Sequence, residues 1–117
     1  MRILLRIGES TTTASMLENQ STRDLLAQLP LTLTFSDYNG TEKIIYLPEA
    51  LSTADAPEGS DPGIGDITYY APWGNLAIFY QDFGYSPGLV KLGTVDSGVD
   101  VLAAQSGDFT VTIERAD

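Results

Sequence analysis

Residues 65–86 restrict the choice of fold most strongly, because they concentrate aromatic side chains in two short runs. This stretch contains the only Trp, four of the six Tyr and two of the four Phe of the chain. Residues 66–71 and 76–81 are rich in β-branched and aromatic types, and both runs are short for helices. Residues 72–75, Pro-Trp-Gly-Asn, separate them and are typical of a turn. We therefore predict a β-hairpin.

Both faces of the predicted hairpin carry bulky side chains. Tyr69 and Tyr70 are adjacent in the first run, and Ile78 and Phe79 are adjacent in the second. A strand with one solvated face alternates apolar and polar residues, whereas a strand covered on both faces does not. We therefore expect this hairpin near the centre of a β-structure.

The rest of the chain predicts further short strands. Alternating or β-branched runs between turns place them at residues 2–7, 11–17, 31–36, 43–47, 89–95 and 109–114. Asn39 and Gly40 tolerate the positive φ values of a tight hairpin turn. Residues 99–104 are compatible with a helical turn or a short strand. The pattern is that of an all-β barrel or sandwich.

One helix of about two turns is predicted before residue 30. Ser21 and Asp24 have the spacing of a capping box, and Leu25, Leu26 and Leu29 follow on one face. Pro30 ends the helix, because a proline ring disfavours helical geometry in the residue before it. So short a helix requires packing against a sheet.

Residues 48–65 are predicted to form a long acidic loop, and sequence alone leaves open whether it has a function. Four carboxylates in and after it are candidates for Ca²⁺, namely Asp55, Glu58, Asp61 and Asp66. They lack the alternating spacing of a dedicated calcium loop, which favours a solvated loop. An alternative role for Asp66 is to bond backbone amides and hold the start of the hairpin. We predict no metal site and no cofactor.

Composition limits the classes of protein to consider. The 117 residues form one predicted domain, 1–117, with 43% hydrophobic residues. No apolar run is long enough to span a bilayer, and Arg6 and Glu9 interrupt the apolar start before a signal peptide could form. The chain has no Cys and no His, so it lacks disulfides and the commonest general base. We expect a reducing cytoplasm.

The net charge of −10 argues against nucleic acid as a partner. Six Lys and Arg are scattered among sixteen Asp and Glu, so a phosphate backbone would be repelled. The acidic excess is expected to keep the protein soluble.

Several segments resemble a family of small bacterial cyclophilin-like proteins. These are residues 65–80, the earlier Asp-Tyr-Asn-Gly-Thr-Glu-Lys at 37–43, and Leu-Ser-Thr-Ala-Asp-Ala-Pro at 51–57. Residues 92–102 are similar to the penultimate strand and following turn of true cyclophilins, and residues 22–29 lie where those proteins carry their first helix. The resemblance implies a mainly β fold, a closed barrel of about eight strands with one or two short helices.

The resemblance does not carry over the catalytic motif. Cyclophilins isomerise prolyl bonds with an Arg that precedes a Phe-Met-x-Gln-Gly run and lies beside an apolar groove. This chain lacks that run, and it has no Lys or Arg between Lys43 and Lys91. The missing isomerase motif therefore argues against an enzyme.

Aromatic side chains are the candidates for a ligand groove. The predicted groove residues, with one neighbouring amide, are Tyr69, Tyr70, Trp73, Asn75, Phe79, Phe83 and Tyr85. The alternative is that these rings fill the barrel and its end, which is favoured for the Phe positions. Trp73 is balanced between the two, because it lies in a predicted turn and turns lie at the surface.

Three functions remain open. The first is a non-catalytic binding or interaction module for an unknown peptide or small molecule. The second is a weak or divergent peptidyl-prolyl isomerase, and the third is an accessory domain for a flavodoxin-like redox protein, a partnership that the family resemblance suggests. A homodimer is among the assemblies left open.

Overall fold

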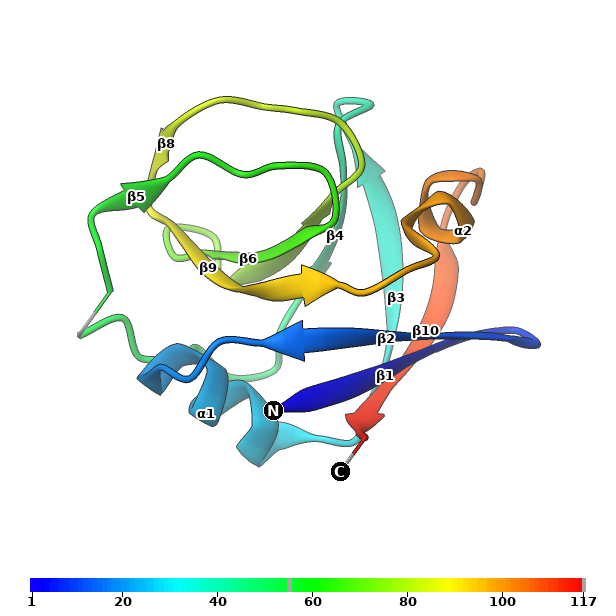
Figure 1. Cartoon of the computed structure of the whole chain (residues 1–117), viewed down its shortest axis with the longest axis horizontal. Coiled ribbons are helices and arrows are strands. Elements are labelled where there is room, and N and C mark those ends of the chain that lie inside the picture. The colour runs from blue at the N-terminus through cyan, green and yellow to red at the C-terminus, as the bar shows by residue number, and fades with distance from the viewer. Residues whose placement is uncertain (55, 117) are drawn as a thin grey trace.

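Eight antiparallel strands close into a barrel in the computed structural model, which describes residues 1–54 and 56–116. Around the barrel the order is β1-β10-β3-β4-β7-β6-β9-β2 (Figure 1). The strands are β1 (Arg2–Ile7), β2 (Ser10–Met16), β3 (Leu31–Tyr38), β4 (Glu42–Tyr46), β6 (Asp66–Tyr70), β7 (Asn75–Phe79), β9 (Leu89–Val95) and β10 (Phe109–Arg115). This confirms the closed eight-stranded barrel and excludes the sandwich.

The first and last strands are neighbours in the barrel. β1 pairs with β10 from Ile3↔Arg115 to Arg6↔Thr112, and with β2 along its whole length. The two ends of the described chain, residues 1 and 116, therefore lie close together (Figure 1). Closure leaves neither strand as a free edge, which removes the commonest site of self-association in β-proteins.

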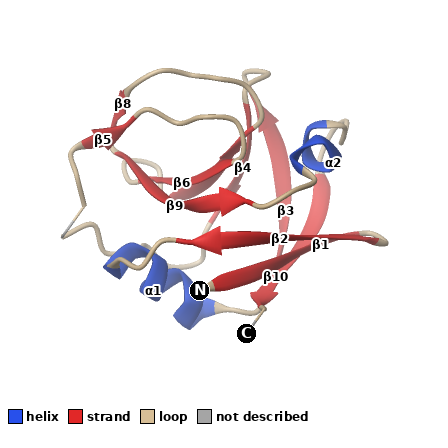
Figure 2. Ribbon diagram, in the orientation of Figure 1, coloured by secondary structure: helices blue, strands red, loops and turns tan. Residues whose placement is uncertain are grey.

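Two short helices lie on opposite sides of the barrel (Figure 2), α1 (Gln20–Gln28) and α2 (Val99–Ala103). Leu25 and Leu26 of α1 and Leu102 of α2 belong to the core cluster inside the barrel. Residues 99–103 are thus helical, which decides between the two readings of that segment. No helix in the described part of the chain has both the length and the apolarity needed to cross a membrane.

The capping box predicted at Ser21 is wrong. Helix α1 begins at Gln20 with Asn19 as its N-cap, and the Asn19 side chain accepts a hydrogen bond from the Thr22 amide at 2.8 Å. Ser21 lies inside the helix, and its hydroxyl donates to the Ser52 carbonyl. Asn is as good an N-cap as Ser, and the Ser21 hydroxyl is engaged with residue 52 instead of capping the helix.

The tight turn at Asn39 and Gly40 is confirmed. Both residues have positive φ, 59° and 68°, and the Thr41 amide closes the turn on the Tyr38 carbonyl at 3.2 Å. Positive φ at both central positions matches the right-handed twist of the flanking strands. The turn brings the end of β3 next to the start of β4, with Tyr38 opposite Glu42.

The acidic segment 48–65 is held to the barrel at several points. Leu51 is buried in the core, and its amide donates a hydrogen bond to the Tyr69 hydroxyl oxygen. The strand β5 (Gly59–Ser60) pairs with β8 (Ser86–Pro87) as a small separate sheet. Among the described residues no three carboxylates gather into a metal-binding group, and Asp55 lies outside them.

Asp66 takes the structural role proposed as the alternative to metal binding. Its Oδ2 accepts a hydrogen bond from the Gly63 amide at 2.9 Å, and its Oδ1 accepts one from the Thr94 hydroxyl at 3.2 Å. Lys91 lies 3.5 Å from the same Oδ1. These contacts hold the start of β6 against β9.

Candidate functional site

The outer surface of one side of the barrel carries a second apolar cluster. Inside the barrel, Tyr69, Leu76 and Ile78 join the main core. The alternate residues Ala77 and Phe79 point outward, and with Ile44, Leu89 and Tyr70 they form a separate cluster. The hairpin β6–β7 is thus covered on both faces, which confirms the expectation from its sequence.

Strand register sets the floor of a pocket in this outer cluster. Glu42 on β4 lies opposite both Tyr38 on β3 and Phe79 on β7. At the far end of β7, Asn75 lies opposite Tyr70 on β6. Because side chains on paired positions share a face, these residues line one surface. The pocket over this surface, which we call the outer pocket, has a volume of about 150 Å³. Its lining residues are Tyr38, Glu42, Ile44, Tyr70, Trp73, Asn75, Phe79, Phe83, Ser86 and Leu89.

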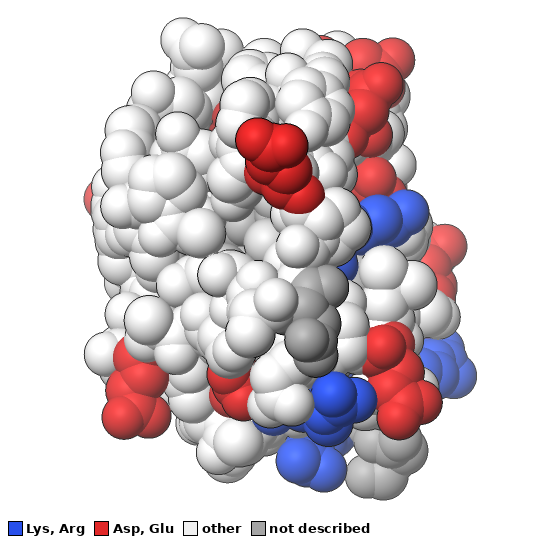
Figure 3. Space-filling model, turned by 90° about the vertical axis from the view of Figure 1, so that its left-hand side faces the viewer, with Lys and Arg blue, Asp and Glu red and all other residues white. Residues whose placement is uncertain are grey.

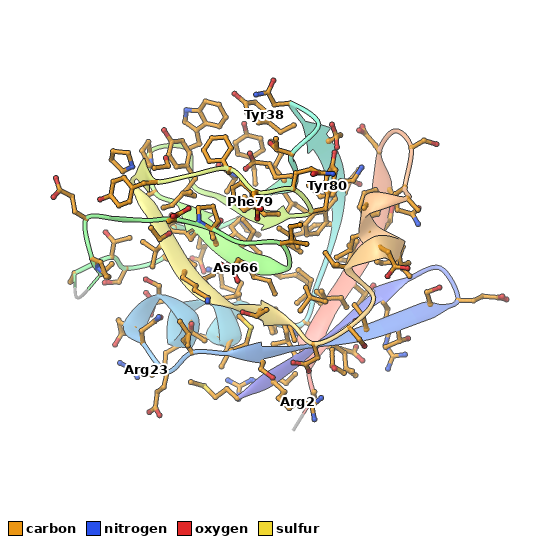
Figure 4. All side chains as sticks on the ribbon, turned by 45° about the horizontal axis from the view of Figure 1, so that its top comes forward. Arg2, Arg23, Tyr38, Asp66, Phe79 and Tyr80 are labelled. Carbon is orange, nitrogen blue, oxygen red and sulfur yellow. The ribbon has the colours of Figure 1, made fainter. Side chains whose placement is uncertain are left out.

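Aromatic rings form the walls of the outer pocket. The Trp73 ring contacts Tyr38 and Tyr70 edge to face, with centroid separations of 5.5 and 5.3 Å. The ring of Phe83 packs on Phe79 in the floor of the pocket, with 5.5 Å between the ring centroids. In Figure 4 the side chains of Tyr38 and Phe79 lie in the upper part of the view, and Arg2 and Arg23 lie at the opposite side. Apolar cavities of roughly 150 Å³ accept a guest the size of benzene.

Asn75 supplies an unpartnered acceptor in the pocket wall. The residue is 2% exposed, its Nδ2 donates to the Leu76 carbonyl at 3.2 Å, and its Oδ1 has no hydrogen-bond partner in the described part of the chain. The orientation of the amide follows from this contact, because a carbonyl accepts only from the NH₂ group. A buried acceptor without a donor costs about 1–3 kcal/mol. A ligand that donates to Oδ1 would recover this cost.

Glu42 supplies a carboxylate at the other end of the pocket. The residue is 7% exposed, and Oε1 accepts a hydrogen bond from the Thr41 hydroxyl at 3.2 Å. No Lys or Arg forms an ion pair with it among the described residues. Burial raises the pKa of Glu42, the Thr41 hydrogen bond lowers it, and the nearby Asp37 charge raises it further. Removal from water disfavours the charged carboxylate, and this is the largest of the three effects on the pKa.

Glu42→Gln is expected to stabilise the ligand-free protein at pH 7 by about 2–4 °C in Tm. The pKa of Glu42 is raised above its ordinary 4.5, so its protonated form is the one that folding favours. In the parent protein, the stability contributed by protonated Glu42 is complete below pH 4.5 and is lost as the pH rises through the raised pKa. Thermal melts at pH 7 and pH 4 measure it, and the gain should shrink at pH 4. The exposed Glu9→Gln is the control, and an equal gain there, or a lower Tm for Glu42→Gln, would contradict the reading.

Five of the seven predicted groove residues come together in the outer pocket. They are Tyr70, Trp73, Asn75, Phe79 and Phe83. Two predicted members are not in its lining. Tyr69 is 2% exposed inside the barrel, because it precedes Tyr70 on a strand and so faces the opposite side. Tyr85 is 60% exposed beside the β5–β8 sheet.

Five lining residues were not predicted, namely Tyr38, Glu42, Ile44, Ser86 and Leu89. Alternation along β4 was a signal for two of them, because Glu42 and Ile44 share a face with each other and not with Lys43. Their partnership with the aromatic hairpin depends on the β4–β7 pairing, which joins residues 29 to 37 positions apart. Nothing local in the sequence predicts that pairing.

The basic side chains are engaged elsewhere. The contacts are Arg2 with Asp96, Arg6 with Glu114, Arg23 with Glu18, Lys43 with Asp37, Lys91 with Asp66, and Arg115 with the Leu26 carbonyl. Figure 3 shows a broad uncharged area at the upper left of the face that carries β5 and β8, with Lys and Arg to the right and below. None of the six lines the outer pocket.

Lys43 is an alkylammonium group buried within the protein itself. Its Nζ donates to the Gln105 carbonyl at 2.8 Å and lies 3.3 Å from Asp37 Oδ1. The rings of Tyr80 and Phe109 lie 5.4 and 5.6 Å from the same nitrogen. The hydrogen bond from Tyr80 to Asp37 raises the pKa of that phenol to about 12. One carboxylate, one carbonyl and two rings together hold this cation.

A second cavity, of about 230 Å³, lies between the start of α1, the segment before β5, and β9. Its polar side chains already have partners. Asn19 caps α1, the Ser21 hydroxyl donates to the Ser52 carbonyl, and the Ser60 hydroxyl donates to the Leu89 carbonyl. The outer pocket is therefore the better candidate, because it alone of the two holds a buried polar atom without a partner.

Known proteins resemble this chain in fold and, through a family model, in sequence. A hypothetical protein from Archaeoglobus fulgidus, known from a solution structure, superposes with a TM-score of 0.73. The two are 16% identical, and the match covers 99% of this chain and 95% of the archaeal one. This likeness concerns the fold alone. No curated protein matches the chain in sequence. The family model described as the Cyclophilin-like family matches residues 5–114, and the chain therefore belongs to this family.

Proposed function

We propose that this domain is a non-catalytic binding module whose ligand, a peptide segment or a small molecule, occupies the outer pocket. The observation that carries the proposal is Asn75, a residue of the pocket lining whose buried Oδ1 has no hydrogen-bond partner among the described residues. Buried acceptors are normally satisfied, and exceptions call for a reason. A small pocket with aromatic walls is typical of a ligand site, and a ligand that donates a hydrogen bond to Asn75 would explain the unpartnered acceptor.

The charges around the pocket support binding over prolyl isomerisation. The family resemblance connects isomerisation with a guanidinium beside the groove, and no Arg is among the lining residues. A pocket that binds the planar and twisted states of an amide equally well gives affinity without rate acceleration. The absence of Cys from the sequence keeps a reducing cytoplasm as the proposed compartment.

The only Trp of the chain provides a direct test, because Trp73 lines the pocket. Titration with the neutral peptide acetyl-Ala-Ala-Pro-Ala-amide and with small neutral amides is expected to change its fluorescence saturably. In ¹⁵N NMR spectra the shifted amides should cluster around β4, β6 and β7. Exchange spectra of the proline peptide are expected to show no faster cis–trans interconversion with the protein present.

A matched pair of variants separates pocket binding from general surface adhesion. Phe83→Ala removes a ring that lines the pocket, and Tyr85→Ala removes a comparably exposed ring that does not. The first should weaken binding several-fold and the second should leave it unchanged. Equal loss in both would place the ligand elsewhere, and acceleration of proline isomerisation that disappears in Arg23→Ala would promote the isomerase hypothesis.

A further inference from the structure

We infer that the outer pocket takes an alkylammonium ligand, an amine carried on an apolar chain that bears a second N–H donor. The ammonium faces Glu42, and the second donor faces Asn75 Oδ1. The inference rests on the proposed function and adds the chemical class of the ligand. Lysyl peptides and free diamines both present this chemistry.

The spacing of the two polar groups defines the shape of the ligand. Glu42 on β4 lies opposite Phe79 on β7. Asn75 also lies on β7, four positions before Phe79. Four residues of a strand span about 13 Å. Ile44 and Ala77 lie between them on the outer face and offer only apolar contacts. A ligand that serves both polar groups is therefore elongated, with an apolar middle.

The charge at one end selects a cation. Glu42 is 7% exposed, and none of the pocket residues is basic. A buried carboxylate is stabilised when a charged donor reaches it, because charge-assisted hydrogen bonds are about twice as strong as neutral ones. The net charge of −10 favours the approach of a cation as well.

The rings near Glu42 also favour a cation. Tyr38 and Phe79 lie directly across from Glu42 in the strand register, and Phe83 packs on Phe79. The faces of aromatic rings attract positive charge, and this attraction grows when water is excluded. An anionic ligand would meet both the carboxylate and these ring faces.

The same chemistry already operates within the chain. Lys43 Nζ contacts one carboxylate, one carbonyl and two rings. The Glu42 end of the outer pocket presents a similar set around an open space, without the carbonyl: the Glu42 carboxylate and the rings of Tyr38, Phe79 and Phe83. Lys43 itself points to the other face of β4, so it does not fill this space.

Three probes test the inference through Trp73 fluorescence and ¹⁵N NMR. They are the methylamide of N-acetyl-lysine, 1,5-diaminopentane and the methylamide of N-acetyl-norleucine. The norleucine probe lacks only the ammonium group of the lysine probe. The lysine probe is expected to bind about tenfold more tightly than the norleucine probe. Tighter binding of the lysine probe than of the diamine identifies a peptide as the source, and the reverse order identifies a free diamine.

Two variants assign the ends of the ligand. Glu42→Gln should remove the tenfold preference for the lysine probe while the variant remains as stable as the parent or more so. Asn75→Leu should weaken the lysine and norleucine probes alike by roughly three- to tenfold, because both carry the amide donor. Glu9→Gln, in the exposed turn between β1 and β2, is the control and should change neither affinity.

The outcomes separate this inference from the proposed function. If the protein binds the norleucine and lysine probes saturably and with equal affinity, the inference is overturned, and a binding module for neutral ligands is left. Failure of all three probes and of the neutral peptides would remove both. A preference for the lysine probe that persists in Glu42→Gln would also overturn the assignment of the ammonium to Glu42.

Discussion

Deleting residues 109–117 is expected to unfold the whole domain, because it removes strand β10 from the middle of the barrel. β10 pairs with β1 on one side and β3 on the other. Val111 and Ile113 are 0% and 1% exposed. Burial of two such side chains contributes about 3–6 kcal/mol. That is a large part of the roughly 5–15 kcal/mol by which a typical domain is stable.

The measurement is the dispersion of the ¹H–¹⁵N spectrum, supported by far-ultraviolet circular dichroism. The deletion should collapse the dispersion. A shorter deletion of residues 116–117 leaves β10 complete, since the strand ends at Arg115, and should retain a dispersed spectrum. A dispersed spectrum after the longer deletion would show that the remaining seven strands fold without closure.

Gly93→Ala is expected to destabilise the protein by about 3 kcal/mol or more, and to lower Tm by roughly 10 °C. A Cβ at residue 93 would lie 2.4 Å from the Ser15 carbonyl oxygen and 2.9 Å from Met16 Cα. Both are backbone atoms of β2, so the overlap is relieved only if the strands separate. The β2–β9 seam has only three paired positions, and Met16↔Gly93 is one of them.

Gly63→Ala is the matched control for this substitution. No atom of residues 1–54 and 56–116 lies within 4 Å of a Cβ built at residue 63, and the φ of Gly63 is not in the positive range. Its effect should stay within about 0.5 kcal/mol, or stabilise slightly by restricting the unfolded chain. Denaturant unfolding of both variants makes the comparison. A Gly93→Ala variant as stable as Gly63→Ala would mean that the seam adjusts without loss.

Local sequence determined most of the elements of this fold. The alternation from Leu31 to Ser36 belongs to a strand, the Asn39-Gly40 pair forms a tight turn, and Pro30 follows the helix that it was expected to end. These features depend on neighbouring residues, on backbone preferences and on side-chain period, and such information is contained in a short window of the chain. The family resemblance supplied the closure of the barrel.

Tertiary structure alone decided the composition of the pocket. Tyr69 and Tyr70 are both aromatic neighbours on one strand, and only the placement of the barrel interior put the first in the core and the second in the pocket. Glu42 reached Phe79 through the β4–β7 pairing. Burial and unmet hydrogen bonding belong to the assembled surface, because they depend on which distant residues exclude water. For this reason the sequence determined the strands, and only the closed barrel decided that Glu42 and Asn75 stand at the two ends of one aromatic pocket.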